Sequence, residues 1–140
     1  MAETPYRVFR FLVEIDGLEV GGFSQVAGIE RSTEFEEFRE GGVNDHVHKL
    51  ATLTKHPNLT LRRGLSDRDE LWGWHQDVVD GSVRRRTITV VLHARDDSVA
   101  ARWIFADAYP VKWNGTDLDA VGDTILTEAV EFVHRGMRRG

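Results

Sequence analysis

The stretch 59-LTLRRGLSDRDELWGWHQDVVDG-81 decides the fold class, because a short strand pattern is followed there by the one convincing helix pattern of the chain. Leu59 and Leu61 alternate with polar residues, as in a half-buried strand. The helix is expected at about residues 67–80. Because the other periodic segments alternate, the sequence predicts a mainly β protein with one helix.

The expected helix has signals at both ends and along one face. Ser66 can cap the free amides at its start, and the two aspartates that follow closely suit the positive end of the helix dipole. Gly81 is expected to end it. Leu71, Trp74 and Val78 recur at helical spacing and are predicted to pack the helix onto a sheet.

The segment before this stretch alternates with the period of strands. Phe11, Val13 and Ile15 form the apolar set of one strand, and the Asp16-Gly17 pair supplies a turn. A second strand is expected over residues 18–29, where internal glycines indicate a bulge or a close backbone approach. Together these segments indicate a bent sheet.

The segments after the helix are also strand-like, although two of them are ambiguous. Ile88, Val90 and Leu92 alternate cleanly. Residues 99–108 contain alanines that favour a helix, but their larger apolar residues alternate, so a strand is expected. The apolar residues of segment 124–134 fit the period of a helix as well as that of a strand. Many short strands with one helix predict two packed antiparallel sheets, as a barrel or a sandwich.

Residues 30–50 have a different character, because they are charged, broken by glycines and poor in core residues. A long segment of this kind in a small domain is usually functional, so we expect a protruding arm that contacts other molecules. The residues assigned to this contact surface are Glu37, Phe38, Arg39, Glu40, Gly41, Gly42, Val43, Asn44, His46, His48, Lys49 and Leu50.

The composition narrows the function classes. The 140 residues suit one domain, and 41% hydrophobic with 29% charged residues suits a folded globular protein. A net charge of −5 argues against general binding to nucleic acid or to an anionic membrane. The chain has no cysteine, no signal-peptide pattern at its N-terminus and no apolar run of membrane-spanning length. We therefore expect synthesis in the cytoplasm without a signal peptide.

The sequence offers no complete catalytic constellation. His46 and His48 have a spacing that could hold a metal, but an exposed polar pair is the better interpretation. His75 lacks a recognisable nucleophile partner. The tryptophans at positions 72, 74, 103 and 113 are interpreted as core or interface anchors rather than as a stacking platform for bases or sugars. We therefore expect no enzyme activity, metal or cofactor.

Four ordered motifs carry a resemblance to a known family: residues 11–30 (FLVEIDGLEVGGFSQVAGIE), 37–50 (EFREGGVNDHVHKL), 59–81 and 109–113 (YPVKW). Together they resemble the tail tube proteins of contractile phage tails and of related extracellular injection systems. The resemblance runs from Phe9 to about Met137. It implies two packed antiparallel sheets with one flanking helix, similar to the Hcp ring protein of type VI secretion.

The resemblance also implies how the protein works. Six subunits would close into a ring, and rings would stack into a hollow tube for cargo or DNA, with the segment from Arg39 to Leu50 reaching neighbouring subunits. The implied partners are further copies of the chain, a sheath protein, the baseplate or spike hub, a tube terminator, and a luminal cargo or tape-measure protein. Two alternatives stay open, a tube initiator at the baseplate and a secreted Hcp-like ring that binds effectors.

Overall fold

The computed structural model describes residues 10–38, 47–115, 122 and 125–140. Its single described helix is α1 (Glu70–Val79). The strands are β1 (Arg10–Ile15), β2 (Leu18–Phe23), β3 (Gln25–Ala27), β4 (Ser32–Phe38), β5 (His48–Lys55), β6 (Leu59–Gly64), β7 (Arg86–His93), β8 (Val99–Gly115), β9 (Thr127–Val133) and β10 (Met137–Arg139).

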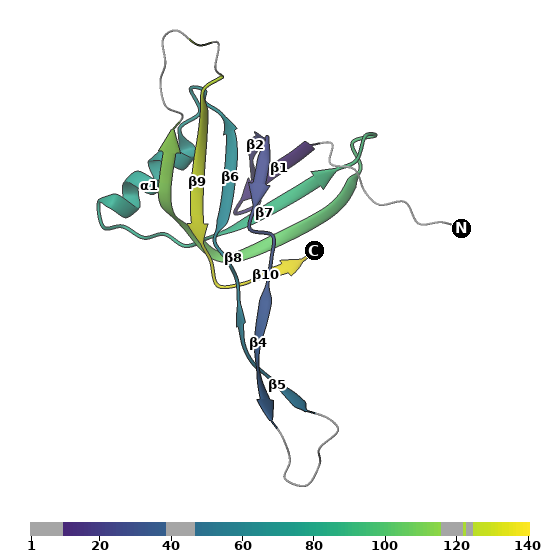
Figure 1. Ribbon diagram of the computed structural model, residues 1–140. Coiled ribbons are helices and arrows are strands. Elements are labelled where there is room, and N and C mark those ends of the chain that lie inside the picture. The colour runs from purple at the N-terminus through teal and green to yellow at the C-terminus, as the bar shows by residue number, and fades with distance from the viewer. Residues whose placement is uncertain (1–9, 39–46, 116–121, 123–124) are drawn as a thin grey trace.

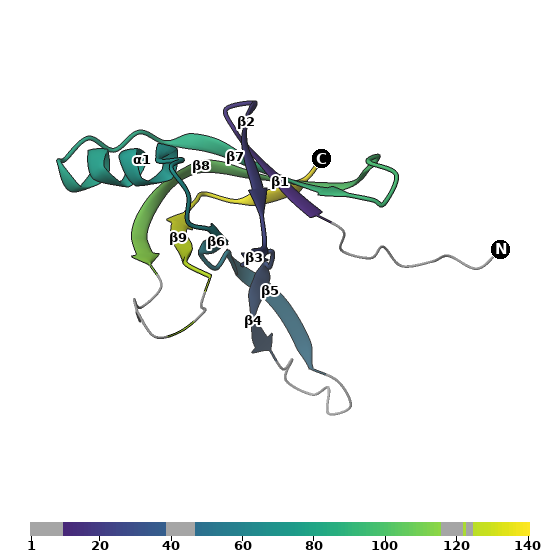
Figure 2. The ribbon, with the colours of Figure 1, turned by 90° about the horizontal axis from the view of Figure 1, so that it is seen from above.

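Two antiparallel sheets pack as a sandwich, with α1 at one side and the β4–β5 hairpin projecting away from the body (Figures 1 and 2). The strand order is β2-β1-β7-β8-β9-β6-β3, and β10 adds to the free edge of β8. One sheet holds β2, β1, β7 and β10, and the other holds β9, β6 and β3. The predicted fold class is confirmed, as a sandwich rather than a closed barrel.

Two bent segments connect the sheets. Strand β8 pairs with β7 up to Ala108 and with β9 from Tyr109 onward, so one strand belongs to both sheets. Asp107, with φ of 52°, lies just before this change of partner. On the opposite side Ser24 alone separates β2 from β3. The expected strand at residues 99–108 is correct but too short, because the chain bends at this point without leaving the sheet.

The core lies between the inner faces of the two sheets. Along most strands every second side chain points inward, and these inward side chains form the core. Its fully buried side chains include Val13, Ile88, Val90, Phe105, Leu59, Leu61, Val130 and Phe132. Helix α1 adds Leu71 and Trp74, which are 1% and 3% exposed. The Trp74 ring lies 5.4 Å from the ring of Phe132, which connects the helix to β9.

The helix begins later than expected. Its N-terminal boundary is Asp69, and no side chain caps it. The Ser66 hydroxyl instead accepts the Arg68 backbone N–H at 3.3 Å. The preceding loop is held in non-helical form because the Leu65 N–H donates to the Leu126 carbonyl at 2.8 Å. The prediction of Ser66 as the cap was therefore wrong.

Other local predictions are confirmed. Gly81 has φ of 93° and donates its N–H to the Val78 carbonyl, which ends the helix. Gly21 has φ of 118° beside the register shift between β1 and β2, so the expected bulge is present.

The ambiguous segment at residues 124–134 contains strand β9. It pairs with β6 on one edge and β8 on the other, and this tertiary pairing decides between the two periods.

Candidate assembly surface

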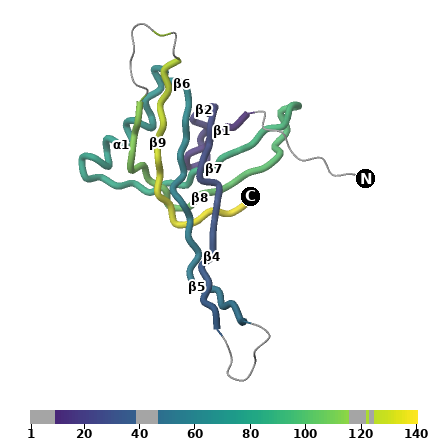
Figure 3. Tube along the Cα trace, viewed as in Figure 1, coloured from purple at the N-terminus to yellow at the C-terminus, as the bar shows by residue number. Residues whose placement is uncertain are grey.

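The β4–β5 hairpin, called the arm below, continues from the adjacent strands β3 and β6 and projects beyond the body (Figure 3). Its antiparallel ladder runs from the Ser32–Lys55 pair to the Phe38–His48 pair. The hydroxyls of Thr33 and Thr54 are hydrogen-bonded across it at 2.9 Å. These contacts hold the two strands to each other.

Every residue of β4 and β5 is exposed, including large apolar ones. Phe35, Phe38, Leu50 and Leu53 are each 51–56% exposed. The register puts Phe38 and Leu50 on one face, whereas Phe35 lies on the other. A two-stranded hairpin alone is marginally stable in water. Exposed apolar groups on both faces therefore make the arm a candidate contact surface.

Charges on the arm are arranged by strand. Strand β4 carries Glu34, Glu36 and Glu37, and β5 carries Lys49 and Lys55. Lys55 pairs with Glu34, and the Lys49 Nζ lies 5.5 Å from the centre of the Phe35 ring. Exposed pairs of this kind contribute little to stability. Their effect is to give the two edges of the arm opposite charge, which can set the orientation of a docking partner.

The arm is fixed to the body by the two segments that connect β3 to β4 and β5 to β6, which pass closely at Gly28 and Asn58. Gly28 has φ of 99°, and a Cβ atom at this position would collide with the carbonyl oxygen of Asn58. The Glu30 N–H then donates to the Gly28 carbonyl at 2.9 Å. Glycine is therefore required here, because both the backbone angle and the contact exclude a side chain.

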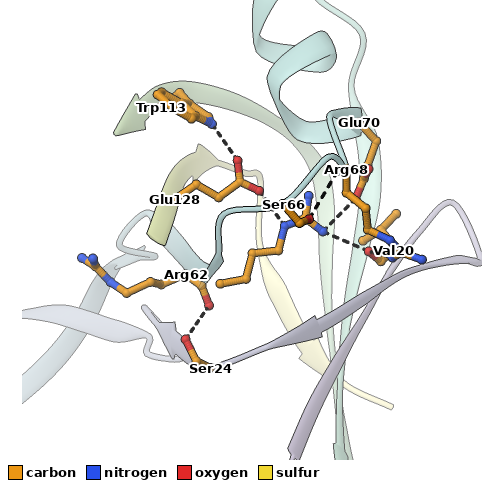
Figure 4. A network of polar contacts seen from close by, with 9 residues as sticks. Val20, Ser24, Arg62, Ser66, Arg68, Glu70, Trp113 and Glu128 are labelled. Atoms are coloured by element: carbon orange, nitrogen blue, oxygen red, sulfur yellow. Dashed lines mark hydrogen bonds and ion pairs between the residues drawn. The ribbon is translucent and has the colours of Figure 1, made fainter. Parts of the chain in front are cut away.

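A buried polar network fixes the helix to both sheets. Arg63 of β6 is 6% exposed, and its Nε donates to the Glu128 carboxylate of β9 at 2.6 Å. Its second nitrogen bonds Glu70 of α1 at 2.8 Å and the Val20 carbonyl of β2 at 3.0 Å. Glu128 also accepts the Trp113 indole N–H at 3.0 Å (Figure 4). This network positions α1.

A second exposed apolar surface lies between α1 and the end of β8. Trp72 is 48% exposed, and its ring meets the Trp113 ring edge-on at a centroid distance of 4.8 Å. These two rings, with His75, Gln76 and Val79, line a hollow of about 410 Å³. The sequence identified the tryptophans as anchors but could not show that Trp72 points outward.

The residues predicted as sites are placed as follows. Glu37, Phe38, His48, Lys49 and Leu50 lie on the arm near its outer end. The other residues predicted for this interface lie outside the described residues: Arg39, Glu40, Gly41, Gly42, Val43, Asn44 and His46. On α1, Leu71 and Trp74 are buried and Val78 is half-buried.

The described part of the chain offers few side chains arranged for acid–base catalysis or for binding a metal. Within residues 10–38, 47–115, 122 and 125–140, no group of three His, Asp or Glu side chains could hold a metal ion. The described helix is too short and too polar to cross a membrane. Hydrogen bonds from the Ser98 hydroxyl and N–H lower the pKa of Asp96 in the β7–β8 turn. This exposed turn is far in sequence from both apolar surfaces.

Comparisons with known proteins identify the family of this fold. The family model described as T4-like virus tail tube protein gp19 matches residues 7–138. The chain therefore belongs to this family of tail tube proteins. A comparison with curated protein sequences gives no match.

Solved structures share the fold over nearly the whole chain. A protein in the six-fold symmetrised baseplate of the anti-feeding prophage is 27% identical, with a TM-score of 0.87 and coverage of 99% of this chain and 97% of that one. A protein in the sheath–tube complex of the extracellular injection system PVC is 23% identical, with a TM-score of 0.86 and coverage of 99% and 93%. Hcp1 from Flavobacterium johnsoniae is 18% identical, with a TM-score of 0.60 and coverage of 94% and 95%.

Proposed function

We propose that this tail tube protein is the inner-tube subunit of a contractile injection system or phage tail, and that six copies form a ring and rings stack through the arm. The observation that carries the proposal is the arm itself, whose apolar side chains are exposed on both faces. A neighbouring copy would cover these side chains, and ring closure would also pair exposed sheet edges.

Six-fold symmetry is supported by the 27% identical protein, which belongs to a baseplate solved with six-fold symmetry. The sheath, the baseplate hub and a tube terminator are the proposed external partners, since structural relatives come from sheath–tube, cap and baseplate assemblies. The hollow of the tube would carry cargo, DNA or a tape-measure protein. In this role the chain is a structural part of a phage tail or injection particle and performs no catalysis.

A second candidate is the tube initiator, which would sit at the baseplate and start the tube. The same baseplate relative favours it. The two roles differ in one property, because a main tube subunit has to stack on copies of itself. An initiator would form a single ring and would need another protein to continue.

Electron microscopy of the purified chain, alone and with its sheath protein, tests the proposal. We expect hollow tubes with six-fold symmetry in cross-section. Single rings that extend only after a paralogue is added would assign the initiator role, and stable rings that never stack would assign a soluble Hcp-like role. A chain that stays monomeric at high concentration and with the sheath protein would contradict ring formation.

A further inference from the structure

Two histidines meet at the root of the arm, the segment that joins β5 to β6. His56 lies directly after β5, and His134 directly after β9. Their ring centroids are 5.6 Å apart, and the Phe105 ring packs edge-on against His134 at 5.0 Å. The Nδ1 atom of His56 is buried and has no hydrogen-bond partner in the described structure. The pair therefore joins the end of the arm to the turn between β9 and β10.

The hydrogen bonds of His134 require one neutral form of its ring. The Gly136 N–H donates to Nδ1 at 3.1 Å, so Nδ1 carries no proton. Nε2 must then carry the proton, and it donates to the Pro57 carbonyl at 3.1 Å. A second proton, on Nδ1, would make this atom a donor. It would then face another donor, the Gly136 N–H, and the two could not form a hydrogen bond. Because both bonds use the same ring orientation, a ring that turns away from Gly136 also leaves Pro57.

The charges around His134 do not favour its protonation. Burial is the largest effect and lowers the pKa of His134. Backbone hydrogen bonds with Pro57 and Gly136 raise it in part, and the neighbouring His56 lowers it when that ring is charged. Arg135 lies next to His134 and is directed to Asp107 of β8, at 3.7 Å. Lys55 precedes His56 and pairs with Glu34 on the arm. Among the described residues, no carboxylate forms an ion pair with either ring.

We propose that His134 and His56 form a pH-sensitive latch at the root of the arm, closed while His134 is neutral and opened when Nδ1 is protonated. The closed latch connects the His56–Asn58 segment to the β9–β10 turn and so fixes the direction in which the arm leaves the body. The open latch frees that segment. A loss of tube assembly at low pH would follow as well, a consequence that rests on the proposed function.

Hydrogen exchange read by mass spectrometry tests the latch without requiring tubes. The full chain is compared at pH 7.5 and pH 5.0, with rates corrected for intrinsic exchange and with sedimentation used to match the assembly state. In peptides covering residues 50–58 and 134–138, we expect faster exchange at pH 5.0. The acceleration has an upper limit of about tenfold for each unit by which the pKa of the open form exceeds that of the closed form. His134→Gln should remove this difference between the two pH values.

His93→Gln is the matched control, because the His93 Nδ1 lies 3.1 Å from the Asp97 carbonyl, where it donates and where a charged ring is tolerated. This variant should keep the acceleration. An acceleration that persists in His134→Gln, or that is absent from the parent, would overturn the latch. If His134→Gln does not fold, nitrogen-15 NMR of the parent decides, because an Nδ1–H tautomer at pH 7.5 or a His134 pKa at or above about 6.5 would also overturn it.

Discussion

Trp72 and Trp74 are two residues apart and have opposite environments. Trp74 is 3% exposed, packs against Phe132 and donates its indole N–H to the Arg84 carbonyl at 2.9 Å. Trp74→Ala leaves a large cavity and an unpaired carbonyl, so we expect unfolding to become easier by about 3–5 kcal/mol. Urea denaturation followed by circular dichroism measures this loss.

Trp72→Ala is the control for that measurement. Its side chain is 48% exposed, so its removal should lower the free energy of unfolding by much less than the removal of Trp74. Equal losses in the two variants would show that the burial of the helix face is assigned wrongly.

Arg63 is the buried charged residue whose removal should lower the free energy of unfolding most. Arg63→Met would leave the Glu128 carboxylate, 3% exposed, without its cation, and breaking such a buried pair costs about 3–5 kcal/mol. Arg62→Met, at the neighbouring half-buried position, should cost much less. Thermal unfolding of both variants checks this, and the double variant Arg63→Met/Glu128→Gln should recover part of the loss. A double variant that is less stable than Arg63→Met would contradict the pairing.

The sequence contained more information about these residues than periodicity alone revealed. The spacing of Leu71 and Trp74 indicated one helix stripe, and both are buried. Arg63 follows Leu59 and Leu61 at the same two-residue spacing, so the sequence already indicated an arginine on the strand face that packs into the core. The sequence could not indicate the partners in this network. Glu70 and Glu128 pair with Arg63 from α1 and β9, and Trp113 of β8 bonds Glu128, so their proximity depends on the three-dimensional packing.

At the scale of elements, local patterns predicted strand identity better than strand length. The mainly β class with one helix followed from alternation. The helix start was misplaced because a hydrogen bond between distant residues, Leu65 and Leu126, holds the preceding loop. Strand β8 was predicted too short because its change of partner at Ala108 and Tyr109 is a property of the two sheets.

The arm is the element whose surface should separate assembly from folding. Phe38→Ser removes an exposed ring, 51% accessible, whose centroid lies 6.5 Å from that of the His48 ring. We expect the free energy of unfolding of the isolated subunit to change by less than about 1 kcal/mol. Tube formation should fall strongly, because interface anchors of this type dominate binding. Pelleting by ultracentrifugation measures the assembled fraction.

Ile125→Ser is the matched control for this experiment, because Ile125 is a more exposed apolar residue, 80% accessible, outside the arm. Tubes should form normally from it. If both variants lose tubes equally, general surface hydrophobicity drives assembly and the arm has no special role. If Phe38→Ser assembles like the parent, this face of the arm is not a contact surface.

At the scale of the whole molecule, stability should depend on the protonation of His134. Burial lowers its pKa in the folded state, so the unfolded chain takes up the proton first as the pH falls. The stabilisation is complete above about pH 6.5, the ordinary histidine value, and is lost as the pH falls through the folded-state pKa. Urea denaturation between pH 7.5 and 5 should show this decline in the parent and a smaller one in His134→Gln. Identical slopes would exclude His134 as the cause.

The proposed separation between a body that folds and an arm that mediates assembly leads to one decisive deletion. Replacing residues 39–49 with a short glycine-serine linker removes part of the arm and leaves every core residue of the described structure in place. Shortening a surface loop changes closure entropy only slowly, so the body should keep its β content and most of its stability. The variant should no longer stack into tubes, because the segment proposed to reach neighbouring copies is gone. Circular dichroism and electron microscopy of one preparation decide the matter: intact tubes would exclude the arm as the stacking element, and an unfolded product would show that it belongs to the folding unit.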